Sequence, residues 1–326
     1  MRTALALLLS TVPLAAQAQS ENRVLTVYAE DYIASEWGPG PAIKQGFEAF
    51  CDCELRFVTG DILPRLLIEG ADTQADVVFG LNTDVLARAR ASGLFAPHGQ
   101  DTSAMSLPIE WDDPLFLPYN WGETAFVYDT TRLDNPPASF ADLLAAEDIR
   151  IVIQDPRSSI SGLALLLWVK HVYGEKAGAA WAQLAPKVLT VTRGWSESYG
   201  MFTSGEADMV LSYTTSPAYH IAAEGDDTKR AAIFPEGHYF MTEVAGQLAG
   251  TDQPELAQAF MDWILTPDFQ KVIPLANWSL PAALPEEDWP QVMRELPRPQ
   301  TTLFYSENEA EALRQAALDE WLRAFN

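Results

Sequence analysis

Aromatic side chains surround a short hydroxyl-rich turn in the segment 192–220. Trp195 and Tyr199 precede the turn, Tyr213 begins it, and Tyr219 follows it. Aromatic rings attract flat and cationic molecules, while hydroxyl and backbone N–H groups bind polar or negatively charged ones. The combination predicts a binding site for a small, flat, polar molecule, including a cationic one. The alternative is a core strand whose rings only pack together, and these residues alone do not decide between the two.

The elements around the turn place it at the end of a strand. Met209–Leu211 is a short apolar run typical of a buried strand. Thr214–Pro217 then offers helix N-cap residues and a proline suited to the first helical turn. The predicted strand Arg150–Ile153 is likewise followed by a hydroxyl-rich turn and a helix. Ligands of open α/β sheets bind beyond the carboxyl ends of the strands, so we expect both turns to face one cleft.

The order of the predicted elements indicates an α/β fold with two lobes. Residues 23–80 alternate strand and helix, as in a parallel or mixed sheet covered by helices. The β-patterned segments Thr124–Tyr128 and His238–Val244 are expected to cross between the lobes. We therefore expect a mixed sheet flanked by helices in each lobe, with the ligand between the lobes. The expected boundaries are 19–123 plus 246–326 for lobe one and 124–245 for lobe two.

Met1–Ala18 has the pattern of a secretory signal peptide. Arg2 supplies the positive charge, Ala4–Leu9 opens an apolar stretch, and Ala16 to Ala18 forms a small-x-small cleavage site. The apolar stretch is too short to span a bilayer, and no cysteine follows the cleavage site to carry a lipid. We therefore expect an exported soluble protein, which in a bacterium lies in the periplasm.

Composition excludes one class of partner. The 326-residue chain has a formal net charge of −24, whereas nucleic-acid binding needs a basic patch. Hydrophobic residues make up 48% of the chain, which is enough for two sizeable cores. We expect a monomer that binds no nucleic acid. The acidity also fits a cationic ligand, although exported proteins are often acidic for solubility alone.

Cys51 and Cys53 are the only two cysteines. An oxidising compartment favours a disulfide between them, although a bridge across one residue closes a small ring. A reactive thiol is the alternative. A metal site would need two further ligands, and no histidine lies nearby in the sequence. Asp61 follows the next predicted strand and precedes an apolar helix, so an N-cap is its structural role and a binding role stays open.

Several motifs together resemble the thiamine-binding proteins of bacterial ABC importers, a family with the two-lobed, type II periplasmic-binding-protein fold. The general features are the stretch Gly205–Asp208 before a strand and Leu265–Gln270 on the late helices. The more specific stretches are Tyr28–Leu55, IQDPRSS at 153–159, TRGWSESYG at 192–200, LSYTTSPAYH at 211–220, EGHYF at 236–240 and ANWSLP at 276–281. The resemblance covers essentially the whole chain after the signal peptide.

The resemblance implies a receptor that binds thiamine and its mono- and diphosphates and delivers them to a membrane permease. It needs no cofactor. Rings would hold the cationic thiazolium, Asp61 the exocyclic amine, and the two hydroxyl turns the hydroxyethyl or phosphate end. The implied ligand-binding residues are Asp61, Ser159, Ile160, Trp195, Tyr213, Thr214, Thr215, Ser216, Tyr219 and Trp278.

Three positions depart from the family pattern. The turn Thr59–Asp61 is shorter, and Glu30 stands where the family can show a tyrosine. Ile160 stands where a threonine is expected, which leaves only its backbone as a donor. These changes bear on affinity and on the preference among the phosphates.

Two alternatives are a ferric-ion receptor and a thiamine-degrading enzyme of the same fold. Tyr213, Tyr219, His220 and His238 would be the iron ligands, but the two tyrosines are not adjacent. An enzyme would attack with a cysteine in the cleft. The cysteines precede the second strand, which would put them at the end of the sheet away from the ligand.

Overall fold

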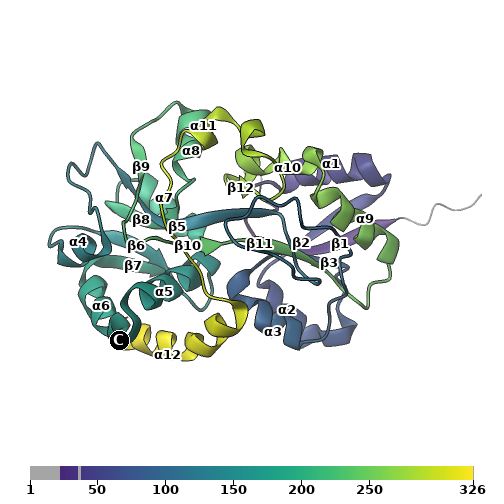
Figure 1. The fold of residues 1–326 in the computed structure, drawn as a ribbon, viewed down its shortest axis with the longest axis horizontal. Helices are drawn as coiled ribbons and strands as arrows, with labels where there is room; N and C mark the ends of the chain where they lie inside the picture. The colour runs from purple at the N-terminus through teal and green to yellow at the C-terminus, as the bar shows by residue number, and fades with distance from the viewer. Residues whose placement is uncertain (1–22, 36–37, 326) are drawn as a thin grey trace, which may run out of the picture.

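The computed structural model describes residues 23–35 and 38–325, so the predicted signal peptide Met1–Ala18 lies outside the described residues. Figure 1 shows two lobes, each built around one sheet, with helices packed on both. Within the described residues, no helix has the length and apolar composition needed to cross a membrane.

Lobe one contains a five-stranded sheet with the order β2-β1-β3-β11-β4. The strands β1, β2 and β3 are parallel, while β11 runs antiparallel to β3 and β4. This mixed sheet confirms the expectation for lobe one. Its strands are β1 (Val24–Ala29), β2 (Glu54–Thr59), β3 (Val77–Asn82), β4 (Leu117–Pro118) and β11 (Glu243–Gln247). The helices around it are α1 (Gly40–Cys51), α2 (Ile62–Glu69), α3 (Leu86–Ala91), α9 (Pro254–Ile264) and α10 (Pro267–Gln270).

Lobe two contains an eight-stranded mixed sheet with the order β13-β10-β5-β8-β6-β7, and β9 and β12 pair with β5. The strands are β5 (Asn120–Asp129), β6 (Ile151–Gln154), β7 (Val188–Thr192), β8 (Met209–Tyr213), β9 (Lys229–Ala232), β10 (His238–Met241), β12 (Leu280–Pro281) and β13 (Thr302–Leu303). The helices are α4 (Phe140–Ala145), α5 (Ile160–Tyr173), α6 (Ala177–Leu184), α7 (Trp195–Thr203), α8 (Pro217–Tyr219), α11 (Gln291–Arg294) and α12 (Glu307–Phe325).

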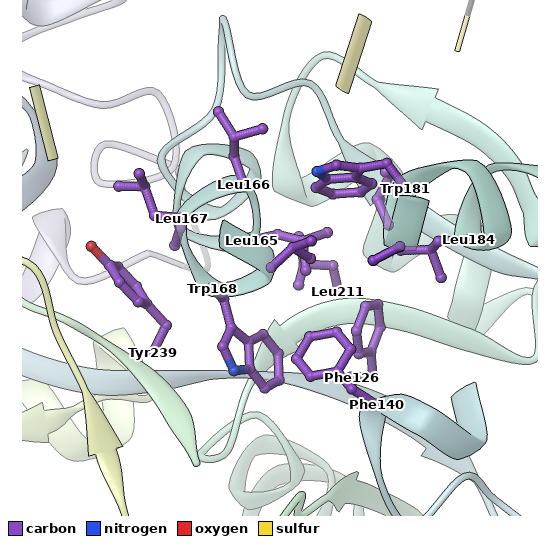
Figure 2. Packing of buried hydrophobic residues seen from close by; sticks show 14 of the residues in the cluster. Phe126, Phe140, Leu165, Leu166, Leu167, Trp168, Trp181, Leu184, Leu211 and Tyr239 are labelled. Carbon is purple, nitrogen blue, oxygen red and sulfur yellow. The ribbon is translucent and has the colours of Figure 1, made fainter. Parts of the chain in front are cut away.

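Helix α5 forms the centre of the lobe-two core. Its residues from Ser161 to Val169 are all buried, which is why the helix is apolar on every side. Trp168 packs edge-on against Phe140, with ring centroids 4.5 Å apart, and stacks on Phe126 at 6.1 Å. Figure 2 shows these rings between α5 and the sheet. The core holds the N-terminus of α5 in a fixed place, and that end faces the other lobe.

The chain crosses between the two sheets at two direct strand-to-strand connections, as the sequence predicts, and passes to lobe two a third time between α10 and β12. Tyr119 separates β4 of lobe one from β5 of lobe two. Thr242 separates β10 of lobe two from β11 of lobe one. The predicted crossing His238–Val244 therefore contains both β10 and the start of β11, while Thr124–Tyr128 lies within β5.

The C-terminal helix differs from the prediction. The expected boundaries place all of 246–326 in lobe one, but α12 packs mainly against α5 and α6 of lobe two. Its residues Ala310, Ala317 and Trp321 belong to the lobe-two core. It also contacts lobe one near α3, where the Arg90 guanidinium lies 2.9 Å from the Glu307 carboxylate. An amphipathic helix pattern reveals an apolar face but does not reveal which lobe will cover it.

A disulfide joins Cys51 and Cys53, as the sequence analysis favours. The bridge lies between the end of α1 and the start of β2, and the residue between the cysteines, Asp52, has a left-handed backbone with φ of 49°. Both sulfurs are therefore engaged in the bridge.

Candidate ligand-binding site

A cavity of about 820 Å³ lies between the two lobes. Its size falls within the range of small-molecule binding sites. Eight of the ten predicted ligand-binding residues line it: Asp61, Ser159, Ile160, Trp195, Tyr213, Ser216, Tyr219 and Trp278. The structure thus brings together candidates that are separated by more than 200 positions in the sequence, but it does not test whether each of them touches a ligand.

Trp195 forms a rigid part of the lobe-two wall. It is the first residue of α7, and its indole N–H donates to the Ser212 hydroxyl at 2.8 Å. Its ring stacks on Tyr199, with centroids 4.6 Å apart and planes 23° apart. A ring fixed in this way loses little conformational entropy when a flat ligand stacks on it.

Tyr219 and Trp278 form a second aromatic wall. Their rings meet edge-to-face with centroids 5.3 Å apart. Trp278 follows the short helical turn Ile273–Asn277 and has φ of 53°. A non-glycine residue in the left-handed region costs about 1–3 kcal/mol, and such residues cluster at ligand-binding sites. The backbone strain here orients an aromatic ring at the cavity.

The two hydroxyl turns differ from each other. Ser159 is the N-cap of α5, and its hydroxyl accepts from the Gly162 backbone N–H at 3.5 Å. The start of α5 therefore directs backbone donors and its dipole at the cavity. In the second turn, the Ser216 hydroxyl lies 2.7 Å from the Ser212 hydroxyl and accepts from the Tyr213 N–H at 3.2 Å.

Thr214 and Thr215, the other two predicted binding residues, are not among the residues that line the cavity. They are 4% and 3% exposed, and the backbone of Thr214 donates to the Glu123 carbonyl. The turn bends directly after β8, so these two side chains face the interior while Tyr213 and Ser216 face the cavity.

Asp61 lies at the cavity edge and takes part in an ion pair between the lobes. Its carboxylate accepts from the Arg193 guanidinium at 3.4 Å. The two side chains are 59% and 79% exposed, so the pair is a weak one. Asp61 is also the N-cap residue of α2, although its side chain makes no capping hydrogen bond.

Glu243 is a cavity residue that the sequence analysis missed. It begins β11 and is only 2% exposed. Its carboxylate accepts hydrogen bonds from Tyr32, Asn120 and Asn277. Burial raises the pKa of Glu243, and these hydrogen bonds oppose the rise. The available signal was one acidic residue within a β-patterned, otherwise apolar segment.

Glu30 is the second carboxyl group that was not predicted as a binding residue. The sequence analysis names it only as a departure from the family pattern. It directly follows β1, at the carboxyl end of the strand. Burial raises the pKa of Glu30 to about 8, with further contributions from Glu243, Asp61 and Asp31. Among the described residues, no group donates a hydrogen bond to its side chain.

A chain of hydrogen bonds supports the lobe-two wall beside Tyr219. The Tyr199 hydroxyl lies 2.9 Å from Nε2 of His220, and Nδ1 of His220 lies 2.6 Å from the Glu224 carboxylate. His220, Glu224 and Asp226 place potential metal-binding atoms within 4.8 Å of one another. Asp226 already binds the Lys229 ammonium at 2.9 Å.

The residues of the two alternative functions are only partly found in the cavity, because Tyr213, Tyr219 and His220 line it whereas His238 and the two cysteines do not. His238, named for the ferric-ion site, is fully buried, and its ring bonds to the Thr124 carbonyl and the Phe234 N–H. Cys51 and Cys53 form a disulfide and lie outside the residues that line the cavity.

Comparisons with known proteins agree with this geometry. Residues 43–283 match the family model described as bacterial extracellular solute-binding protein. The chain is 47% identical over 323 residues to the thiamine-binding periplasmic protein of Escherichia coli (strain K12), covering 98% of this chain and 97% of that protein. It is 45% identical over 322 residues to the protein of the same name from Brucella abortus biovar 1 (strain 9-941), covering 97% and 96%.

A solved structure described as a periplasmic thiamin binding protein is 47% identical, with a TM-score of 0.90, and covers 93% of this chain and 96% of that one. This match confirms the two-lobed α/β fold expected from the sequence. The chain belongs to the bacterial extracellular solute-binding protein family, together with these thiamine-binding periplasmic proteins.

Proposed function

We propose that this protein is a periplasmic receptor that binds thiamine between its lobes and delivers it to an ABC permease. One observation carries the proposal: a single cavity has aromatic walls, one buried and one half-buried carboxyl group, and a helix N-terminus. Thiamine has matching parts, namely a flat aminopyrimidine, a cationic thiazolium and a hydroxyethyl arm. The names of the relatives at 45–47% identity support the same ligand.

The aromatic walls suit the two rings of the ligand. Trp195 and the pair of Tyr219 with Trp278 offer ring faces and edges to the cavity. A desolvated cation on an aromatic face gains about 0.5–2 kcal/mol. In this arrangement Asp61 would accept from the exocyclic amine in exchange for Arg193.

The N-terminus of α5 suits the hydroxyethyl arm or its phosphate esters. Ser159, Ile160 and Ser161 all line the cavity there, so Ile160 contributes through its backbone. Arg157 is not a phosphate ligand in this arrangement, because it pairs with Asp155 and lies outside the cavity lining. Arg193 is the one arginine or lysine among the described lining residues. We expect thiamine and its monophosphate and diphosphate to bind.

Calorimetry of the ligand-free mature protein tests the proposal. Thiamine, its two phosphates and ferric citrate would be titrated separately at pH 7.5. We expect submicromolar binding of thiamine with one ligand per chain, accompanied by quenching of tryptophan fluorescence. Binding of ferric citrate alone, or cleavage of thiamine detected by mass spectrometry, would refute the proposed function.

A further inference from the structure

Two carboxyl groups of lobe one face the same end of the cavity. Glu30 follows β1 and Glu243 begins β11, and β3 lies between these two strands in the sheet. Gly80 of β3 lies beside Glu30, since a Cβ atom at position 80 would be in ordinary contact with the Glu30 Cγ atom at 3.4 Å and with the Tyr119 hydroxyl at 3.7 Å. The backbone of Gly80 also has φ of 113°, which other residues rarely adopt.

The two carboxyl groups differ in their hydrogen bonds. Glu243 accepts from Tyr32, Asn120 and Asn277, and such donors favour its ionised form. No described residue donates a hydrogen bond to Glu30, whereas the nearby Tyr119 hydroxyl interacts with Tyr32 and Glu243. When like charges share a site, the group with fewer donors keeps its proton. Glu30 is therefore the group that is protonated in the empty site, in agreement with its raised pKa of about 8.

Among the described residues, no positively charged side chain is paired with Glu30. Asp31 faces it from its own segment, Asp61 from the start of α2, Tyr119 from the crossing, and Glu243 from β11. Across the cavity lie Tyr213 and Arg193, and Arg193 is paired with Asp61. A ligand that brings a positive charge would supply what this end of the cavity lacks.

We propose that Glu30 is a specificity-determining residue for a cationic ligand and exchanges its proton for the positive charge of that ligand. This proposal rests on the proposed function. It goes further because it makes lobe one responsible for the preference for cationic over neutral ligands. The neutral carboxylic acid and the cation become a carboxylate paired with the cation, and one proton passes to solvent. Neutral molecules of similar shape would leave the proton in place and would bind less well.

The sign of the pH dependence follows from this exchange. Because the cation binds the ionised form, thiamine affinity rises with pH until Glu30 is ionised in the empty site. With a pKa of about 8, the affinity is expected to rise about tenfold between pH 6 and 7 and about fivefold between pH 7 and 8. At pH 7, binding should release about 0.9 proton per ligand.

Calorimetry in buffers with different ionisation enthalpies measures that proton directly. Thiamine itself is the probe, because a phosphate ester would titrate in the same range. Glu30→Gln keeps the shape of the side chain and should abolish both the proton release and the pH dependence, with about tenfold weaker binding at pH 8. Glu255→Gln changes an exposed glutamate on α9, outside the cavity lining, and should behave as the wild type.

The outcomes separate the two proposals. Absence of thiamine binding by the wild type at every pH would overturn the proposed function. Thiamine binding without proton release, or proton release that persists in Glu30→Gln, would overturn the role of Glu30 alone. Thermal unfolding of each variant would verify that it is folded.

Discussion

The two sides of the cavity, one from each lobe, differ in how completely their polar groups are hydrogen-bonded. On lobe two, Trp195 bonds to Ser212, and Ser216 bonds to the Tyr213 backbone, so the wall is complete without a ligand. On lobe one, Glu30 has no hydrogen-bond donor among the described residues, and Asp61 binds only an exposed arginine of the other lobe. Lobe two is preorganised, whereas lobe one carries groups that a ligand would satisfy. Preorganised contacts should therefore dominate affinity, and lobe one should determine which ligand is selected.

Replacing Trp195 of lobe two should have the largest effect on thiamine affinity. Trp195→Ala is expected to weaken thiamine binding at least thirtyfold, equal to about 2 kcal/mol, because both the stacking face and the bond to Ser212 are lost. Trp195→Phe should retain part of the affinity. Calorimetry measures both variants. Phe50→Ala is the control, because this ring is 54% exposed on α1, and it should leave affinity unchanged.

Removing the hydrogen bonds of Ser216, which support the lobe-two side of the cavity, should have the next largest effect, and this effect is on stability. Ser216→Ala removes the side-chain acceptor of the Tyr213 N–H and leaves the Ser212 hydroxyl with only its bond from the Trp195 N–H, which should lower the free energy of unfolding by about 1–3 kcal/mol. Urea denaturation measures this change. Thr215→Val is the matched variant, since Thr215 lies outside the cavity lining. A larger loss of thiamine affinity in Thr215→Val than in Ser216→Ala would show that the second turn is oriented differently.

Removing the ion pair between Arg193 and Asp61 should have the smallest effect on thiamine affinity. Arg193→Gln removes the contact with Asp61, and an exposed pair of this kind contributes about 0.2–1 kcal/mol. We expect a change of less than about fivefold in thiamine affinity, and a smaller change at high salt. Stopped-flow fluorescence at low and high ionic strength would measure it. A change of a hundredfold would mean that lobe one depends on this pair as strongly as lobe two depends on its own bonds.

Local patterns predicted much of the fold and one wall of the site. The turn at Tyr213–Ser216 could be placed because a strand, N-cap residues and a proline follow one another in the sequence. The directions of the Thr214 and Thr215 side chains could not be predicted, because they depend on the backbone angles within the turn. Glu243 could not be identified either, since its burial depends on β11 pairing with β3, where it lies opposite Asn82.

The position of α12 has a consequence for the order in which the protein can fold. The lobe-one core is complete in sequence at Ile273, whereas the lobe-two core includes Trp321 near the C-terminus. While the last twenty residues are still being synthesised or exported, the apolar surface of α5 and α6 that α12 covers remains exposed. Lobe one can therefore finish its core before lobe two. The lobe-two side of the cavity then reaches its final structure last.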